Sequence, residues 1–69
     1  MITLYSTGCP KCKVLEQKMG QKNIQYNVVQ DEDKVVEFGI VNNIRSAPLL
    51  DIDGKAFDFI AALNWVREQ

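Results

Sequence analysis

The sequence predicts a small α/β domain in which a four-stranded mixed sheet carries helices on both faces. Three observations lead to this prediction. Apolar and polar residues alternate in short segments, as is typical of strands. Apolar residues recur at helical spacing in longer segments between them. The dipeptide Asp53-Gly54 separates two of the short segments and is a strong signal for a two-residue hairpin.

The predicted elements follow the order strand, helix, strand, helix, strand, strand, helix. Pro10 suits the first position of the first helix, and Asp31 and Asp58 suit the caps of the second and third. A strand–helix–strand unit followed by a helix and a hairpin gives a mixed sheet. The predicted strands are residues 2–6, 24–29, 48–52 and 55–57, and the predicted helices are residues 10–21, 31–43 and 58–68.

Length and charge narrow the class of protein. The 69 residues make one domain, residues 1–69. The net charge of −1 argues against non-specific affinity for nucleic acid, and no apolar run approaches the ~18 residues of a membrane span. The first residues lack the basic and apolar segments of a signal peptide. We therefore expect a cytoplasmic monomer that binds neither nucleic acid nor a membrane.

The segment STGCPKC contains both cysteines of the chain, Cys9 and Cys12, and the chain has no histidine. In the cytoplasm such a pair is usually catalytic or metal-binding. If Cys9 caps the first helix, free backbone N–H groups, the helix dipole and Lys11 all favour its thiolate. Cys12 lies one turn inward and should be more buried and less acidic. This spacing predicts an attacking thiol at Cys9 and a resolving thiol at Cys12.

Metal binding is the alternative. A lone C-x-x-C supplies two ligands, whereas structural zinc needs four. One chain without histidine would need carboxylates or a second copy to complete a site. A module in which two chains share zinc or an iron–sulfur cluster through these thiolates is therefore the second hypothesis.

The segment TLYSTGCPKC, the element order and the segment IRSAPLL before a hairpin together resemble glutaredoxin, a small member of the thioredoxin-fold superfamily. The resemblance covers approximately residues 2–66. It implies a thioredoxin-like fold and a dithiol–disulfide oxidoreductase that uses Cys9 as nucleophile and Cys12 as resolving cysteine. It also implies that Pro48 is a cis-proline beside the active site, with the backbone of Ala47 offered to an extended substrate.

Other parts of the family pattern concern glutathione. Lys11 is a candidate substrate-binding residue and stands where many glutaredoxins have an aromatic residue. The glycine pair that helps to hold glutathione is missing after the hairpin. Arg45 and Asp58 stand where they could contact glutathione, although a solvated loop residue and a helix cap explain them equally well.

The resemblance implies no bound cofactor, with glutathione as an alternative co-substrate. The expected partners are a protein disulfide and an upstream thiol reductant. Glutaredoxin-like proteins with altered glutathione sites include reductants of enzymes such as ribonucleotide reductase, and such an enzyme is one candidate substrate.

Overall fold

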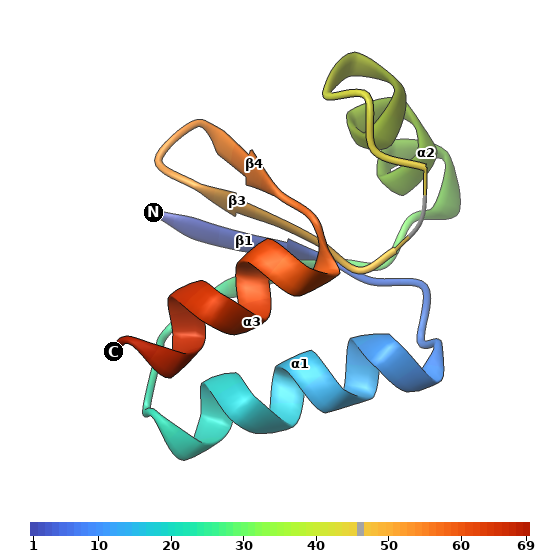
Figure 1. The fold of residues 1–69 in the computed structure, drawn as a ribbon. Coiled ribbons are helices and arrows are strands. Elements are labelled where there is room, and N and C mark those ends of the chain that lie inside the picture. Colours follow the sequence, from blue (N-terminus) through green and yellow to red (C-terminus); the bar gives the residue numbers. More distant parts are fainter. Residues whose placement is uncertain (46) are drawn as a thin grey trace.

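A four-stranded mixed sheet lies at the centre of the molecule (Figure 1). The computed structural model describes residues 1–45 and 47–69. Within them the strands are β1 (Ile2–Tyr5), β2 (Asn27–Val29), β3 (Leu49–Ile52) and β4 (Lys55–Phe57). Their order in the sheet is β2-β1-β3-β4, with β1 parallel to β2 and the other two pairs antiparallel. The predicted mixed α/β architecture, with four strands and three helices in the described residues, is confirmed.

The helices lie on both faces of this sheet. α1 (Pro10–Gln21) and α3 (Phe59–Arg67) pack against each other on one face, and α2 (Glu32–Val41) lies on the other side (Figure 1). Side chains alternate between the faces of a strand. Leu4 therefore joins the core beside α1 and α3, while the ring of Tyr5 stacks on that of Phe38 in α2, with centroids 4.1 Å apart.

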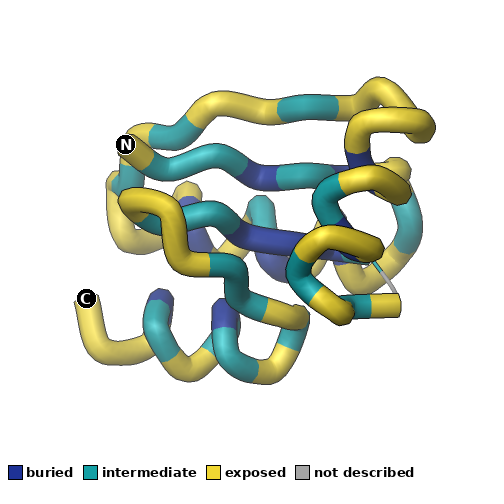
Figure 2. The backbone as a smooth tube through the Cα atoms, turned by 90° about the horizontal axis from the view of Figure 1, so that it is seen from above, coloured by how far each residue is buried: buried dark blue, intermediate teal, exposed yellow. Residues whose placement is uncertain are grey.

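The core fills the space between the sheet and the α1–α3 pair. Buried residues gather on the two middle strands and on the helix faces turned toward them (Figure 2). Helical spacing puts Phe59, Leu63 and Val66 on one face of α3, but only Val66 is fully buried, and the other two are half-buried at the edge of the core. The small side chain of Ala62 instead takes the most enclosed position. The core cluster consists of Leu4, Leu15, Met19, Leu50, Ala62 and Val66.

Short polar residues begin the helices and make the hairpin, as the sequence predicts. Asp31 accepts a hydrogen bond from the N–H of Asp33 at the start of α2, over 3.0 Å. Asp58 caps α3 in the same way. In the hairpin, Asp53 and Gly54 have φ values of 50° and 90°, and type I′ turns require a positive φ at both central residues.

The second strand is shorter than predicted. The sequence places a strand over residues 24–29, but β2 begins at Asn27. The N–H of Ile24 instead donates to the carbonyl of Met19 over 3.1 Å, so this part of the chain completes the end of α1. Ile24 and Tyr26 still pack against the core, as their alternation indicates.

Gly39 determines how closely the chain after α2 can approach that helix. A Cβ atom at this position would lie 2.6 Å from the carbonyl oxygen of Ile44, which no real contact permits. The chain at Ile44 therefore packs directly on the α2 backbone. Among the described residues, no helix has the length and apolar character needed to cross a membrane.

Candidate active site

The two cysteines lie where β1 passes into α1. Cys9 is the N-cap of α1 and is half-buried, while Cys12 lies in the first turn and is fully buried. Their Sγ atoms are 2.8 Å apart, and both residues are free thiols. At this separation the two sulfurs share one hydrogen bond, and little movement separates them from a disulfide. The predicted positions of both thiols, Cys9 at the cap of α1 and Cys12 one turn inward, are confirmed.

The start of α1 holds the pair in this geometry. Pro10 occupies the first position of the helix, where its fixed φ suits the turn and its missing N–H costs no hydrogen bond. The backbone N–H of Cys12 donates to the Cys9 sulfur over 3.4 Å. A sulfur at an N-cap thus replaces the usual oxygen as acceptor and lies at the positive end of the helix dipole.

Ser6 follows β1, three positions before Cys9, and was not among the predicted site residues. It is 0 % exposed and is the buried polar residue found in the described part of the chain. Its Oγ accepts a hydrogen bond from the N–H of Gly8 over 3.1 Å, and Gly8 has the positive φ of 79° that this turn requires. The alternation of Ile2, Leu4 and Ser6 toward the core is the sequence signal that could have revealed it.

The pKa of the Cys12 thiol is lowered from 9.0 to about 7. Burial raises this pKa, but hydrogen bonds from the side chains of Cys9 and Ser6 and from the backbone of Thr7 and Cys9 lower it by more. The sequence leads to the expectation that burial makes Cys12 less acidic, and this lowered pKa runs against it. The expected burial of Cys12 is confirmed.

The segment before β3 closes the site from the other side. The peptide bond between Ala47 and Pro48 is cis, as the resemblance implies, and Pro48 is buried. The carbonyl oxygen of Ala47 lies 3.9 Å from the Cys9 sulfur. Cys9, Cys12, Ala47 and Pro48 are thus brought together from two distant parts of the sequence.

An open cavity of about 520 Å³, here called the α2 groove, begins beside this site. It runs between α2 and the segment that leads to β3. Two of its apolar side chains, Val36 and Ile40, are 53 % and 74 % exposed. The groove is lined by Thr7, Glu32, Val35, Val36, Gly39, Ile40, Asn43, Ile44, Arg45, Ala47 and Leu49.

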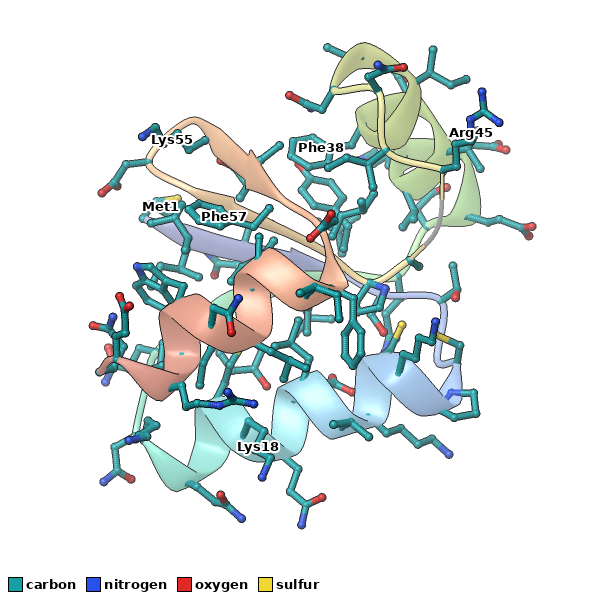
Figure 3. The ribbon with its side chains drawn as sticks, viewed as in Figure 1. Met1, Lys18, Phe38, Arg45, Lys55 and Phe57 are labelled. Atoms are coloured by element: carbon teal, nitrogen blue, oxygen red, sulfur yellow. The ribbon has the colours of Figure 1, made fainter. Side chains whose placement is uncertain are left out.

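The three charged residues predicted to bind substrate have separate surroundings. The Nζ of Lys11 lies 5.7 Å from the centre of the Phe59 ring. This cation–π contact links the start of α1 to the start of α3. Asp58 is exposed, and its carboxylate accepts the N–H of Ala61 over 2.8 Å. Arg45 is exposed in the loop after α2 and extends away from the sheet (Figure 3). It borders the α2 groove.

Among the residues that the structure describes, no group of three or more histidine, cysteine, aspartate or glutamate side chains is placed to hold a metal ion. No protein-family model matches the chain. A search of curated proteins likewise finds no match.

Proposed function

We propose that this protein is a glutaredoxin-like thiol–disulfide oxidoreductase of the thioredoxin fold that cycles between two thiols and a Cys9–Cys12 disulfide. The observation that carries the proposal is the 2.8 Å contact between the two sulfurs at the start of α1. Two thiols so close, one at the surface and one buried, suit two-step disulfide exchange. Because the cysteines carry the electrons, no bound cofactor is needed.

Cys9 performs the first step, because its sulfur is the accessible one of the pair. As a thiolate it receives hydrogen bonds from the Cys12 thiol and from the Cys12 backbone N–H. It attacks one sulfur of the substrate disulfide and forms a mixed disulfide. The substrate's second sulfur leaves as a thiolate with the electron pair of the broken bond and takes a proton from water.

Cys12 performs the second step after losing its proton to water. Its thiolate attacks the Cys9 sulfur, which forms the internal disulfide and breaks the bond to the substrate. The substrate leaves with both sulfurs reduced, and the two electrons have come from the cysteine pair. An upstream thiol reductant then returns the pair to the dithiol.

The α2 groove favours a protein disulfide as substrate. An extended segment could hydrogen-bond to the backbone of Ala47 in the manner of an added strand, and the groove continues from that residue between apolar side chains. The Asp58 carboxylate, by contrast, already accepts a helix N–H. Glutathione is therefore the second choice of substrate, and an enzyme such as ribonucleotide reductase remains a candidate partner.

A reducing compartment such as the cytoplasm fits this cycle. Glutathione and thioredoxin systems there keep thiols reduced, so a dithiol can act repeatedly as a donor of electrons. The proposed working unit is a monomer, because both reacting thiols belong to one chain.

Trapping of the mixed disulfide tests the proposal. The Cys12→Ser variant, mixed with insulin as a protein disulfide, should form a covalent adduct through Cys9 that dithiothreitol releases. The matched Cys9→Ser variant should form none, and only the wild-type protein should reduce insulin in repeated turnovers. The proposal fails if the wild-type protein does not reduce insulin, and the roles are reversed if only Cys9→Ser traps an adduct. Metal analysis of the reduced protein, with its mass in solution, checks for the alternative of a metal site shared by two chains.

A further inference from the structure

We propose that a row of lysines on α1 is a docking surface for an acidic segment of the partner protein, beside the partner cysteine that reacts with Cys9. The row, here called the α1 flank, consists of Lys11, Lys18 and Lys22. This inference rests on the function proposed above and adds the charge of the protein that this function requires. The three lysines are not among the residues that line the α2 groove, so the two surfaces are separate.

Helical spacing and two contacts define the side of α1 on which these lysines lie. Lys18 follows Lys11 by about two helical turns, and Lys22 follows after about one more. The Nζ of Lys11 lies 5.7 Å from the centre of the Phe59 ring at the start of α3. The Nζ of Lys22 donates to the backbone carbonyl of Gln69, beyond the end of α3, over 3.1 Å. The two helices therefore lie side by side with their starts together (Figure 1), and the α1 flank borders α3.

The charges of the α1 flank are open to a partner. All three lysines are exposed. In the described part of the chain, the ion pair that the structure contains joins the N-terminal amine to Asp53, so no carboxylate side chain there is paired with these lysines. The charged residues of α3 and its caps are Asp58, Arg67 and Glu68, which together add one negative charge. The surface that α1 and α3 form at the flank is therefore positive, although the net charge of the chain is −1.

The spacing of the lysines sets the length of the acidic segment. Lys11 is the second residue after Cys9, so the flank begins beside the reacting cysteine. The rise of about 1.5 Å per residue places Lys18 about 10 Å further along α1. An extended chain covers that distance in roughly three to four residues. A stretch of about four glutamates or aspartates next to the partner's cysteine therefore matches the flank.

A polypeptide fits this surface better than a nucleic acid does. Val14 lies between Lys11 and Lys18 at helical spacing and is 41 % exposed, so the flank offers an aliphatic contact among its charges. Proteins that bind single-stranded nucleic acid add aromatic rings on which the bases stack. The ring beside the flank, that of Phe59, is half-buried and already faces the Lys11 ammonium. The chemistry of the flank is therefore that of a partner for an acidic protein segment.

The experiment compares two synthetic peptides that differ only in charge. Each is closed by a disulfide, with a run of glutamates beside one cysteine in the first peptide and a run of glutamines in the second. Reduced protein is mixed with excess peptide, and samples quenched in acid give the second-order rate constant of each reaction. The measured quantity is the ratio of the rate constant for the acidic peptide to that for the neutral one. Any change in the reactivity of Cys9 itself cancels in this ratio.

Wild-type protein should favour the acidic peptide roughly tenfold at low salt, since each exposed ion pair contributes a factor of about two. Lys11→Gln, Lys18→Gln and Lys22→Gln should each lower the ratio about twofold, and the triple variant should bring it close to one. Sodium chloride should do the same to wild type, because salt screens exposed charges.

Lys13→Gln is the matched control. Lys13 is an exposed lysine of the same helix, but helical spacing puts it on the side away from the flank. It lies nearer to Cys12 along the chain than Lys18 does. Lys13→Gln should therefore lower the ratio less than Lys18→Gln if the flank binds the peptide. An equal or larger effect of Lys13→Gln would overturn the proposal, since the ratio would then reflect only the general field around the thiols.

The two proposals can fail separately. If wild-type protein reduces neither peptide, the proposed function is overturned, and a binding measurement still tests the surface. Labelled peptides with serine in place of both cysteines, followed by fluorescence anisotropy, should show wild type binding the acidic peptide more tightly than the triple variant does. Equal binding of the acidic and neutral peptides to wild type would overturn the docking surface. Tighter binding of a single-stranded oligonucleotide than of the acidic peptide, lost in the triple variant, would also overturn it.

Discussion

The carbonyl oxygen of Ala47 lies 3.9 Å from the Cys9 sulfur, although 38 positions separate the two residues in the chain. Under the proposed function, we expect a substrate disulfide that reacts at Cys9 to lie beside this carbonyl group. Ala47 also lines the α2 groove, which opens from this point. The groove is therefore the place to look for the determinants of substrate choice.

Ile40→Asp should weaken the use of protein substrates. Ile40 lines the groove and is 74 % exposed, so its apolar surface is available to a bound segment. Loss of that contact, with a charge in its place, should raise KM for insulin about tenfold, in keeping with the burial of one aliphatic side chain. The reaction with Ellman's reagent should not change.

The neighbouring Val41 provides the matched control. It is 76 % exposed and lies outside the α2 groove. Val41→Asp should therefore leave KM for insulin unchanged. If both aspartates raise KM equally, the effect comes from charge or from α2 stability, and the groove does not bind the substrate.

The reduced protein should become more stable as pH rises from about 7 to 9. The pKa of Cys12 is about 7 in the folded chain against an ordinary 9.0, so the unfolded state binds more protons in this interval. The stabilisation is fully present above pH 9 and is lost as pH falls through 7. Urea unfolding under reducing conditions should show wild type gaining free energy of unfolding relative to Cys12→Ser between these limits. A difference that stays constant with pH would contradict the lowered pKa.

Gly39→Ala should destabilise the fold. The added Cβ would meet the Ile44 carbonyl at 2.6 Å, and backbone on both sides of the contact leaves little room to adjust. Overpacking of this kind costs about 1–3 kcal/mol. Gly20→Ala is the control, because nothing lies within 4 Å of its added Cβ, and there alanine should stabilise α1 by roughly 0.5–1 kcal/mol. Urea unfolding measures both, and similar effects of the two changes would contradict the contact.

Protein disulfides should be reduced faster than a glutathione mixed disulfide at matched thiol concentrations. Asp58→Asn keeps an oxygen for the Ala61 N–H and should leave both rates unchanged, whereas Asp58→Ala should cost about 1 kcal/mol of stability as a lost helix cap. Coupled assays with each substrate and urea unfolding test this. Efficient turnover with glutathione that Asp58→Asn or Arg45→Ala abolishes, at unchanged stability, would show that these residues bind glutathione.

Local signals were enough to predict much of this fold. Three local signals acted through the backbone of neighbouring residues alone: proline at the start of α1, aspartate caps at α2 and α3, and Asp53-Gly54 in the hairpin. Because each depends on only a few adjacent residues, the sequence was sufficient to predict these helix starts and the turn. The position of the thiol pair follows from the predicted start of α1 at Pro10. The early start predicted for β2 failed because Ile24 hydrogen-bonds to the end of α1, a choice that alternation alone does not reveal.

The acidity of Cys12 depends on how the residues just before it fold around its sulfur, and the α2 groove depends on contacts between segments more distant in the chain. Burial alone would raise the Cys12 pKa, and hydrogen bonding from Cys9, Ser6 and the Thr7 backbone lowers it by more. The groove exists because Gly39 lets the chain at Ile44 approach α2, which places Arg45 and Ala47 along one wall. Neither arrangement follows from the spacing of residues along the chain.

The enclosure of Cys12 also has a consequence for damage by peroxides. An oxidant that reaches the site meets Cys9 first and converts it to a sulfenic acid, while Cys12 is 0 % exposed. The Cys12 sulfur, 2.8 Å away before oxidation, can condense with that sulfenic acid and release hydroxide. The product is the same internal disulfide that the proposed cycle forms. We therefore expect the buried thiol to keep Cys9 from the irreversible sulfinic stage, and the reductant of the proposed cycle to restore the dithiol.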